Sequence, residues 1–306
     1  MSEVFNLLLL QNTLRTATPV VLCALGCLMT DQVGIMNIGV DGMMLMGAFF
    51  AVLGSYLFGS WAMGLLFAVV LGVLLGWLYY VFSIKFKSDE FIIGVALNIL
   101  AGGLTVFLLR TIFQVKGSFS DPGIVPLPTI SIPWLESVPV LGAIFSGNTL
   151  LVYVSWVLVL VCWLFLYKTP LGFHLRASGE APEALRASGK SPEKMKRLAS
   201  VLCGVLATLS GAHLSLGYLT MFSENMSASR GYVAVACVIF GGSNPPRVFL
   251  AALLFGFIDA LGMRLQKYIP SDLTSMAPYA VTVVMMVVVA LMKRRQGRRP
   301  CTPQGD

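Results

Sequence analysis

The chain has 306 residues, of which 57% are hydrophobic and only 11% are charged, and its formal net charge is +7. Soluble domains carry about 25% charged residues, so this composition excludes a water-soluble enzyme or a separate soluble domain. It predicts one membrane domain over residues 1–306 with an all-α fold, a polytopic transmembrane helical bundle that lipid surrounds.

Hydrophobic segments recur along the whole chain. A spanning helix needs about 20 mostly apolar residues, and eight segments are of that quality: Thr13–Met29, Val40–Leu57, Trp61–Phe82, Phe91–Leu109, Leu150–Leu166, Leu198–Leu219, Val248–Leu265 and Met276–Met292. A ninth, Gly231–Gly242, is apolar but too short to cross alone. The sequence therefore predicts eight or nine spans.

The basic residues predict the orientation of the chain in the membrane. Of 21 Lys and Arg, seven lie in the central loop (residues 168–197) and five in the C-terminal tail (residues 293–306). This clustering follows the positive-inside rule and puts both segments in the cytoplasm. It is not the charge pattern of a protein that binds nucleic acid. An even number of spans must then separate them, so Gly231–Gly242 must cross as a broken helix.

Counting back from the central loop assigns the remaining connections. Residues 110–149 are expected outside the cell, as is the N-terminus, and residues 83–90 and 31–39 in the cytoplasm. Within the external loop, the apolar patch Trp134–Phe145 suits the membrane interface.

Two apolar runs are interrupted by helix-breaking residues. Glycines break VGIMNIGVDGMM (Val33–Met44), and two glycines and two prolines break FGGSNPPR (Phe240–Arg247). Paired breaks in the two halves of a transporter indicate an inverted repeat whose unwound backbone lines a polar path. The alternative is a tight turn between two helices at each place.

Few polar side chains lie within the predicted spans. An ionisable group at such depth is by default a functional hypothesis, which draws attention to Asp259. Pairing with Arg264, or capping of a broken helix, explains this carboxylate equally well. Asn98 and His213 are more simply explained as residues that form hydrogen bonds between helices. The Gly72-x-x-x-Gly76 pattern predicts close helix packing.

Sequence signatures of chemistry are absent from the chain. It has no GxxxxGK[ST], HExxH or GxSxG motif and no Cys/His spacing for a metal, so we expect no catalytic residues, metal or cofactor. Any ATP-driven transport must take its energy from another subunit.

The central loop can form a short helix over Ala181–Ser188. Pro182 is tolerated in a first turn, Glu180 and Glu183 favour its N-terminal end, and Gly189 is suited to end it. So short a helix is marginal in water and needs a protein surface against it. The loop is therefore a docking surface or, alternatively, a solvated linker that sets topology.

Four stretches carry a family resemblance: TPVVLCALGCLMTDQVGIMNIGVDGMMLMGAF (Thr18–Phe49), GVALNILAGGLTVFLLR (Gly94–Arg110), LGFHLRASGEAPEALRASGKSPEKMK (Leu171–Lys196) and IFGGSNPPRVFLAALLFGFIDALGMRLQ (Ile239–Gln266). The chain resembles ABC importer permeases of the branched-chain amino acid and simple-sugar type, in the nucleoside and simple-sugar branch. In that family the Gly-Glu-x-Pro-x-Ala stretch forms a coupling helix in a cleft of the ATP-binding subunit. The resemblance implies this role for Gly179, Glu180, Pro182, Glu183, Ala184, Arg186 and Gly189. Leu185 departs from the usual alanine, which changes the expected contact surface slightly.

The resemblance also implies a location in a bacterial inner membrane and the partners of the chain. They are two ATP-binding subunits, a second and different permease, and an extracytoplasmic substrate-binding protein, with this chain as the smaller permease. Nucleosides are the first expected substrate, simple sugars the second, and a riboflavin-like vitamin is an alternative. Asn37, Asp41 and Asn98, and after them Asp259, are expected to line the substrate path.

An alternative hypothesis from a different class of transporter is a secondary carrier driven by protons or sodium. Asp259 and His213 would then be the titrating pair in the membrane, and the central loop would only be a linker. Dependence of uptake on membrane potential rather than on ATP would distinguish this carrier from an ABC permease.

Overall fold

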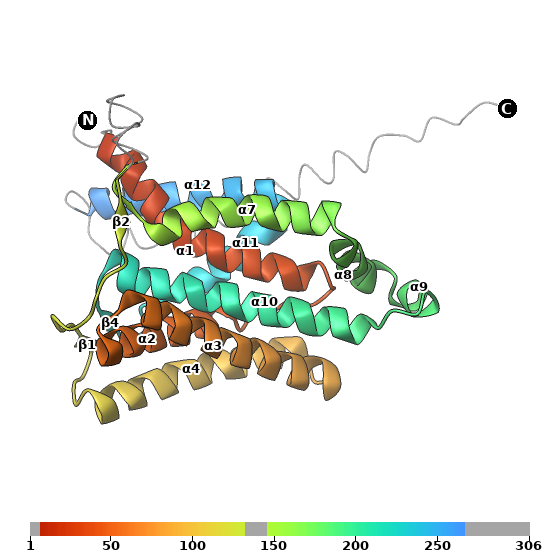
Figure 1. Cartoon of the computed structure of the whole chain (residues 1–306), viewed down its shortest axis with the longest axis horizontal. Helices are drawn as coiled ribbons and strands as arrows, with labels where there is room; N and C mark the ends of the chain where they lie inside the picture. The colour runs from red at the N-terminus through yellow and green to blue at the C-terminus, as the bar shows by residue number, and fades with distance from the viewer. Residues whose placement is uncertain (1–6, 132–145, 267–306) are drawn as a thin grey trace.

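The computed structural model describes residues 7–131 and 146–266, and helices make up most of this part (Figure 1). Its long helices are α1 (Leu7–Asp31), α2 (Val40–Phe58), α3 (Trp61–Tyr80), α4 (Glu90–Ile112), α7 (Leu150–Lys168), α10 (Pro192–Ala212) and α12 (Pro245–Leu265). The shorter helices are α8 (Pro170–Glu180), α9 (Pro182–Ala187) and α11 (Arg230–Gly241). The π-helical turns η1 (Val81–Lys85) and η2 (His213–Tyr218) continue α3 and α10. Two-residue strands form two antiparallel pairs, β1 (Ser118–Phe119) with β4 (Phe222–Ser223) and β2 (Thr129–Ile130) with β3 (Asn148–Thr149).

Seven helices of the described part are long and apolar enough to cross a membrane. They confirm the polytopic helical bundle and correspond to the first seven long segments of the sequence prediction. The eighth segment, Met276–Met292, the tail at residues 293–306 and the interfacial patch Trp134–Phe145 lie outside the described residues. The short segment forms α11, whose 12 residues extend only about 18 Å, less than the roughly 30 Å hydrocarbon core.

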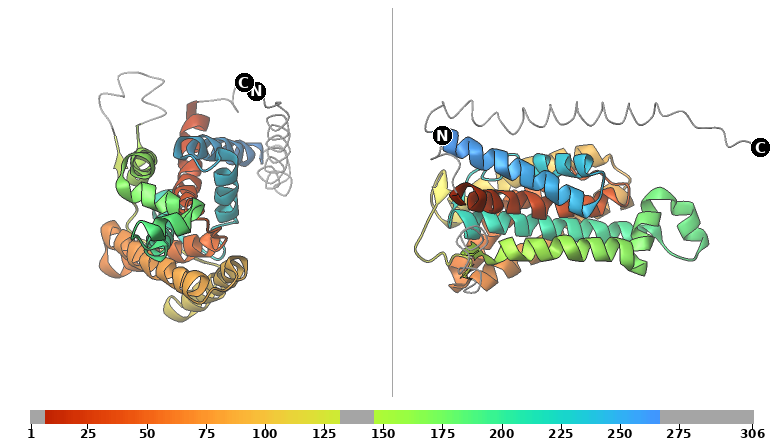
Figure 2. Two further views of the ribbon diagram at one scale, coloured as in Figure 1. Left: turned by 90° about the vertical axis from the view of Figure 1, so that its right-hand side faces the viewer. Right: turned by 90° about the horizontal axis from the view of Figure 1, so that it is seen from above.

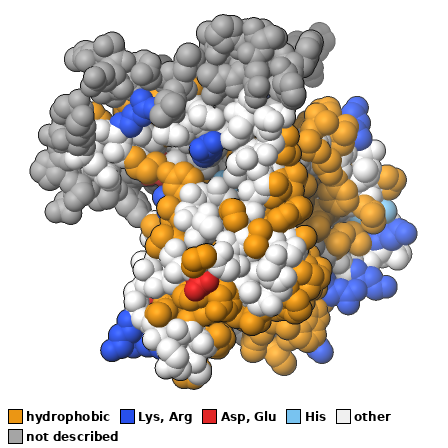
Figure 3. Space-filling model, turned by 60° about the vertical axis from the view of Figure 1, so that its left-hand side comes forward, with side chains coloured by type: hydrophobic (Ala, Val, Ile, Leu, Met, Phe, Trp, Pro, Cys, Tyr) orange, Lys and Arg blue, Asp and Glu red, His pale blue; other side chains and the backbone are white. Residues whose placement is uncertain are grey.

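Three helices form the interior of the bundle. The most apolar stretches of α1, α2 and α10 are 89%, 72% and 72% buried, against 28% for α3, α4 and α7. Seen end-on, α4, α7 and α12 lie at the outside (Figure 2, left). Hydrophobic side chains are spread over the described part of the face in Figure 3, and large ones such as Ile99, Ile92 and Leu250 are more than 60% exposed. Lipid is the solvent that suits such a surface.

Glycines determine how closely the inner helices approach. A Cβ on Gly72 or Gly76 of α3 would collide with α10, at Gly204 and Ser200 respectively, and a Cβ on Gly211 would collide with α2. The predicted Gly72-x-x-x-Gly76 contact is therefore confirmed. Such small residues let helix backbones touch, which strengthens van der Waals packing where lipid offers no hydrophobic driving force.

The connections between helices gather at the two ends of the bundle (Figure 1). At one end Gln32 donates from Nε2 to the Ser243 carbonyl at 2.8 Å, and the Met36 amide donates to Glu90 at 3.0 Å. The same end carries α8 and α9, and the paired strands lie at the other (Figure 1). Residues 31–39 and 83–90 thus share an end with residues 168–197, as the predicted topology requires.

The central segment is more ordered than the loop that we expected. Residues 168–197 contain all of α8 and α9 and the first turn and a half of α10. Local signals explain the first of these helices, because Pro170 occupies its first turn and the Thr169 hydroxyl accepts a hydrogen bond from the Gly172 amide at 3.1 Å.

Candidate functional site

The first break, between α1 and α2, is held by the amide of Asn37. This side chain is only 2% exposed. Its Oδ1 accepts from the Gly39 amide at 2.9 Å, and its Nδ2 lies 3.4 Å from the Cys203 sulfur on α10. Asn37, one of the four predicted path residues, therefore points into the protein and fixes the chain just before α2 begins.

Asn98 of α4 holds the other side of the same break. Its Oδ1 accepts from the Gly42 amide at 2.7 Å, and its Nδ2 donates to the Ile38 carbonyl at 3.1 Å. The same Nδ2 lies 2.9 Å from the Tyr232 hydroxyl on α11. The predicted hydrogen bond between helices is thus present, and it joins three elements through one amide.

Asp41 lies in the first turn of α2 and holds the start of α11. Its two carboxylate oxygens accept from the Gly231 amide and the Ser227 hydroxyl, each at 3.0 Å. A Cβ on Gly231 would collide with Asp41, so only glycine permits this approach. The carboxylate lies at the positive end of the helix dipole and accepts from one of the amides that a helix start leaves unpaired.

Asp259 of α12 pairs with Arg230 at 3.3 Å, and each side chain keeps roughly a quarter to a third of its surface exposed. The sequence suggests Arg264 as the partner, but the structure pairs Asp259 with a cation from the start of α11. His213, the other half of the hypothetical titrating pair, is buried elsewhere, with its ring nitrogens facing Thr149 Oγ1 at 3.5 Å and the Arg15 carbonyl at 3.4 Å.

Residues 227–232 therefore connect three of the four predicted path residues, and we call this segment the α11 junction. Sequence reasoning did not single out its polar side chains Ser227, Arg230 and Tyr232, which bind Asp41, Asp259 and Asn98. One signal was available, because Arg230 is the only Lys or Arg between Arg197 and Arg247. Tyr232 is 44% exposed, so the junction presents an aromatic ring and a hydroxyl at the surface of the described protein.

The second break is a tight turn between α11 and α12. Gly242 and Ser243 both have left-handed backbones, with φ of 58°. The Ser243 carbonyl accepts from Gln32, and its hydroxyl donates to the Asp31 carboxylate. The two predicted breaks thus meet at one end of the bundle.

The segment expected to act as the coupling helix contains α9. Pro182 begins it, Ser188 caps its C-terminus, and Gly189 follows with a left-handed φ of 77°. The Gly189 amide donates to the Arg186 carbonyl at 2.9 Å and the Lys190 amide to the Leu185 carbonyl at 3.2 Å, the two bonds of a Schellman motif. The helix is shorter than the expected Ala181–Ser188.

Two residues of that segment belong to a different helix. Gly179 and Glu180 end α8, and a Cβ on Gly179 would collide with the chain at Gln32–Gly34, so the first break packs directly on this helix end. Leu185 is 4% exposed. Its side chain therefore packs inside the protein. The expectation that its departure from alanine changes the outer contact surface is wrong for this reason.

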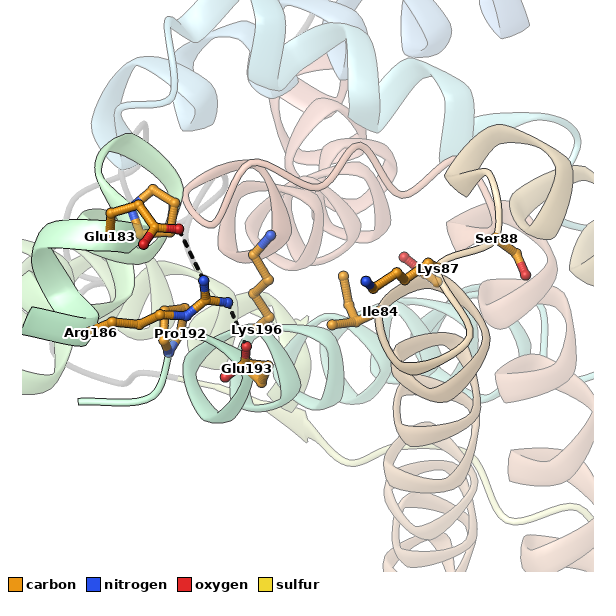
Figure 4. A pocket seen from close by; sticks show the side chains of 10 residues that line it. Ile84, Lys87, Ser88, Glu183, Arg186, Pro192, Glu193 and Lys196 are labelled. Carbon is orange, nitrogen blue, oxygen red and sulfur yellow. Dashed lines mark hydrogen bonds and ion pairs between the residues drawn. The ribbon is translucent and has the colours of Figure 1, made fainter. Parts of the chain in front are cut away.

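The outer face of α9 carries an ion-pair network. Arg186 donates to Glu183 at 3.0 Å and to Glu193 at 2.8 Å (Figure 4). The hydrogen bond with Glu193 and the charge of Glu183 raise the pKa of the Arg186 guanidinium. These side chains border a groove of about 520 Å³. Its remaining lining residues come from η1 and the chain that follows it and from the first turns of α9 and α10: Ser83, Ile84, Lys87, Ser88, Pro182, Pro192 and Lys196. The groove gives this end of the molecule a concave, charged surface.

Comparison with known proteins supplies the family. Residues 9–290 match the family described as branched-chain amino acid transport system, permease component. The chain belongs to this family. It is 32% identical to a guanosine ABC transporter permease of Bacillus subtilis, over 90% of this chain and 89% of the relative. It is 34% identical to a putative glucose ABC transporter permease of Haloferax volcanii (85% and 78% covered). It is 31% identical to a nucleoside ABC transporter permease of Lactococcus lactis (92% of each covered). No solved structure matches the chain.

Members of this family are membrane subunits of ABC transporters, and they work with ATP-binding subunits and a substrate-binding protein. Among the described residues, no group of three or more His, Cys, Asp or Glu could hold a metal ion.

Proposed function

We propose that this protein is the smaller permease subunit of an ATP-driven importer of nucleosides, with simple sugars as the second candidate substrate. The observation that carries the proposal is the α11 junction, where a helix too short to span starts beside polar side chains of α2, α4 and α12. The relatives named for guanosine and nucleosides, which share 31–32% identity over about nine-tenths of this chain, support the substrate class.

The chemistry of the junction suits a nucleoside. Tyr232 offers a ring face for stacking on a base, and the Arg230–Asp259 pair offers donors and acceptors for the base edge and ribose hydroxyls. In our proposal these three side chains contact the substrate. Asn37, Asp41 and Asn98 line the path indirectly, because the polar atoms of all three already bind the protein's own chain.

The end of the bundle that carries α9 is the proposed docking site for ATP-binding subunits. Its exposed Glu183, Ala184 and Arg186 and the neighbouring groove offer a surface for two such subunits beneath a pair of permeases. This end and the C-terminus then lie in the cytoplasm of a bacterial cell, and the strand pairs lie on the side from which a binding protein delivers substrate. A second, different permease completes the path.

Reconstitution of the complete transporter in proteoliposomes tests the substrate and the energy source together. We expect ATP inside the vesicles to drive uptake of guanosine or uridine supplied with the binding protein, and collapse of the membrane potential to leave uptake unchanged. Stimulation of ATP hydrolysis by glucose or riboflavin, but by no nucleoside, would overturn the substrate assignment. Uptake that needs an ion gradient and no ATP would overturn the whole proposal.

A further inference from the structure

A second groove lies between α3 and α10, towards the end of the bundle that carries α9. Its volume is about 300 Å³. Four apolar side chains and two cations line it: Val73, Trp77, Leu198, Val201, Lys194 and Arg197. The groove shares none of these residues with the α11 junction or with the groove beside Arg186.

The packing of α3 on α10 creates this groove. Gly76 lies so close to α10 that a Cβ there would collide with the backbone of Ser200 and Val201. Because the helix backbones touch at this glycine, the bulky neighbour Trp77 must project sideways, and it is 53% exposed. A hollow remains beside the contact, with the indole on one wall and Leu198 on the other.

The two cations at the groove have no acidic partner among the described residues. Lys194 and Arg197 are both exposed, and neither takes part in any of the ion pairs found there. The nearest carboxylate in sequence, Glu193, already accepts from Arg186 and Ser191, each at 2.8 Å. The groove therefore offers two unneutralised positive charges at one end of an apolar wall.

We propose that this groove binds an anionic phospholipid, with the phosphate at Lys194 and Arg197 and the upper acyl chain along Val73, Leu198 and Val201. Basic pockets between transmembrane helices on the cytoplasmic side take anionic headgroups. An exposed tryptophan is typical of the membrane–water boundary, and long cationic side chains reach headgroups while their stems cover apolar surface. The position follows from the cytoplasmic placement of α9, so this inference rests in part on the proposed function.

Lipid binding can be measured without transport, which separates the two claims. The full transporter, purified in mild detergent, is titrated with phosphatidylglycerol or phosphatidylcholine brominated at the upper acyl chain. Quenching of Trp77 fluorescence is taken as the difference from a Trp77→Phe variant. Two headgroup contacts of about 1 kcal/mol each predict roughly 30-fold tighter apparent binding of phosphatidylglycerol. Lys194→Gln/Arg197→Gln should lose this preference.

A charge-matched control is Lys168→Gln/Lys190→Gln, which removes two exposed cations from the same end that line neither groove and should keep the preference. Equal quenching by both lipids in the wild type would overturn the proposal, as would a Lys194→Gln/Arg197→Gln variant that behaves like the wild type. Quenching by neither lipid would show that a protein surface covers Trp77. Full competition by inorganic phosphate would show a site for soluble anions.

Discussion

Replacement of Asp41 by alanine tests whether a side chain of α2 stabilises the start of α11. The carboxylate accepts from the Gly231 amide and the Ser227 hydroxyl, and hydrogen bonds to charged groups contribute about 1.5–3 kcal/mol each. Asp41 keeps a minor part of its surface exposed, so we take the lower value for each bond and expect α11 to lose about 3 kcal/mol of local stability. Asparagine keeps one acceptor and should lose less than alanine.

Hydrogen exchange followed by mass spectrometry measures this loss directly. A local destabilisation of about 3 kcal/mol corresponds to roughly 100-fold faster exchange at the start of α11, in peptides that cover Ser227–Val235. Asp121→Ala is the matched control, because Asp121 accepts from the Gly123 amide at 2.8 Å in an exposed turn far along the chain. If Asp41→Ala exchanges at the wild-type rate while uptake is lost, Asp41 contacts substrate and does not hold the helix.

Three further predictions concern packing and the polar junction. Gly211→Ala should lower the free energy of unfolding by about 1–3 kcal/mol because the new Cβ meets the backbone of α2. Thermal unfolding in detergent would show this loss, and Gly102→Ala is the control, because a Cβ at Gly102 meets nothing within 4 Å. An unchanged unfolding midpoint for Gly211→Ala would contradict the close packing. Either single variant, Arg230→Gln or Asp259→Asn, should reduce uptake more than the double variant does, because each single change leaves one charge unpaired. Lower uptake in the double variant than in either single variant would show that the two residues do not act as an ion pair. Asn98→Leu keeps the side chain branched at Cγ but removes its bonds to three elements, so uptake should fall tenfold or more at normal protein level. Unimpaired uptake would remove this residue from the path.

Local chemistry explains what could be predicted from the sequence. The spans follow from uninterrupted apolar length, and α9 follows from Pro182 and Gly189, which start and stop a helix whatever surrounds them. The sequence also predicts that residues 31–39 and 168–197 lie at the same end of the bundle, because an even number of predicted spans separates them.

The junction could not be predicted because its contacts cross most of the chain. Asp41 and Gly231 are 190 positions apart, and no local pattern shows that a carboxylate in α2 meets an amide in α11. Nor could the sequence alone indicate that Asp259 would pair with Arg230, since Arg264 was nearer along the same helix. Long-range polar contacts of this kind depend on how the helices pack, and that packing is set by glycines whose partners are equally distant.

The docking of ATP-binding subunits on α9 is the central claim, and one copurification tests it. Tagged protein is extracted from its native membrane in mild detergent, as wild type and as Glu183→Arg/Arg186→Glu, with Lys116→Glu at the opposite end as control. The exposed pair contributes less than about 1 kcal/mol, so the variant should fold normally. We predict that an ATP-binding subunit copurifies with wild type and control and is lost from the variant. An ATP-binding subunit retained by the variant, or absent from all three, would contradict the claim.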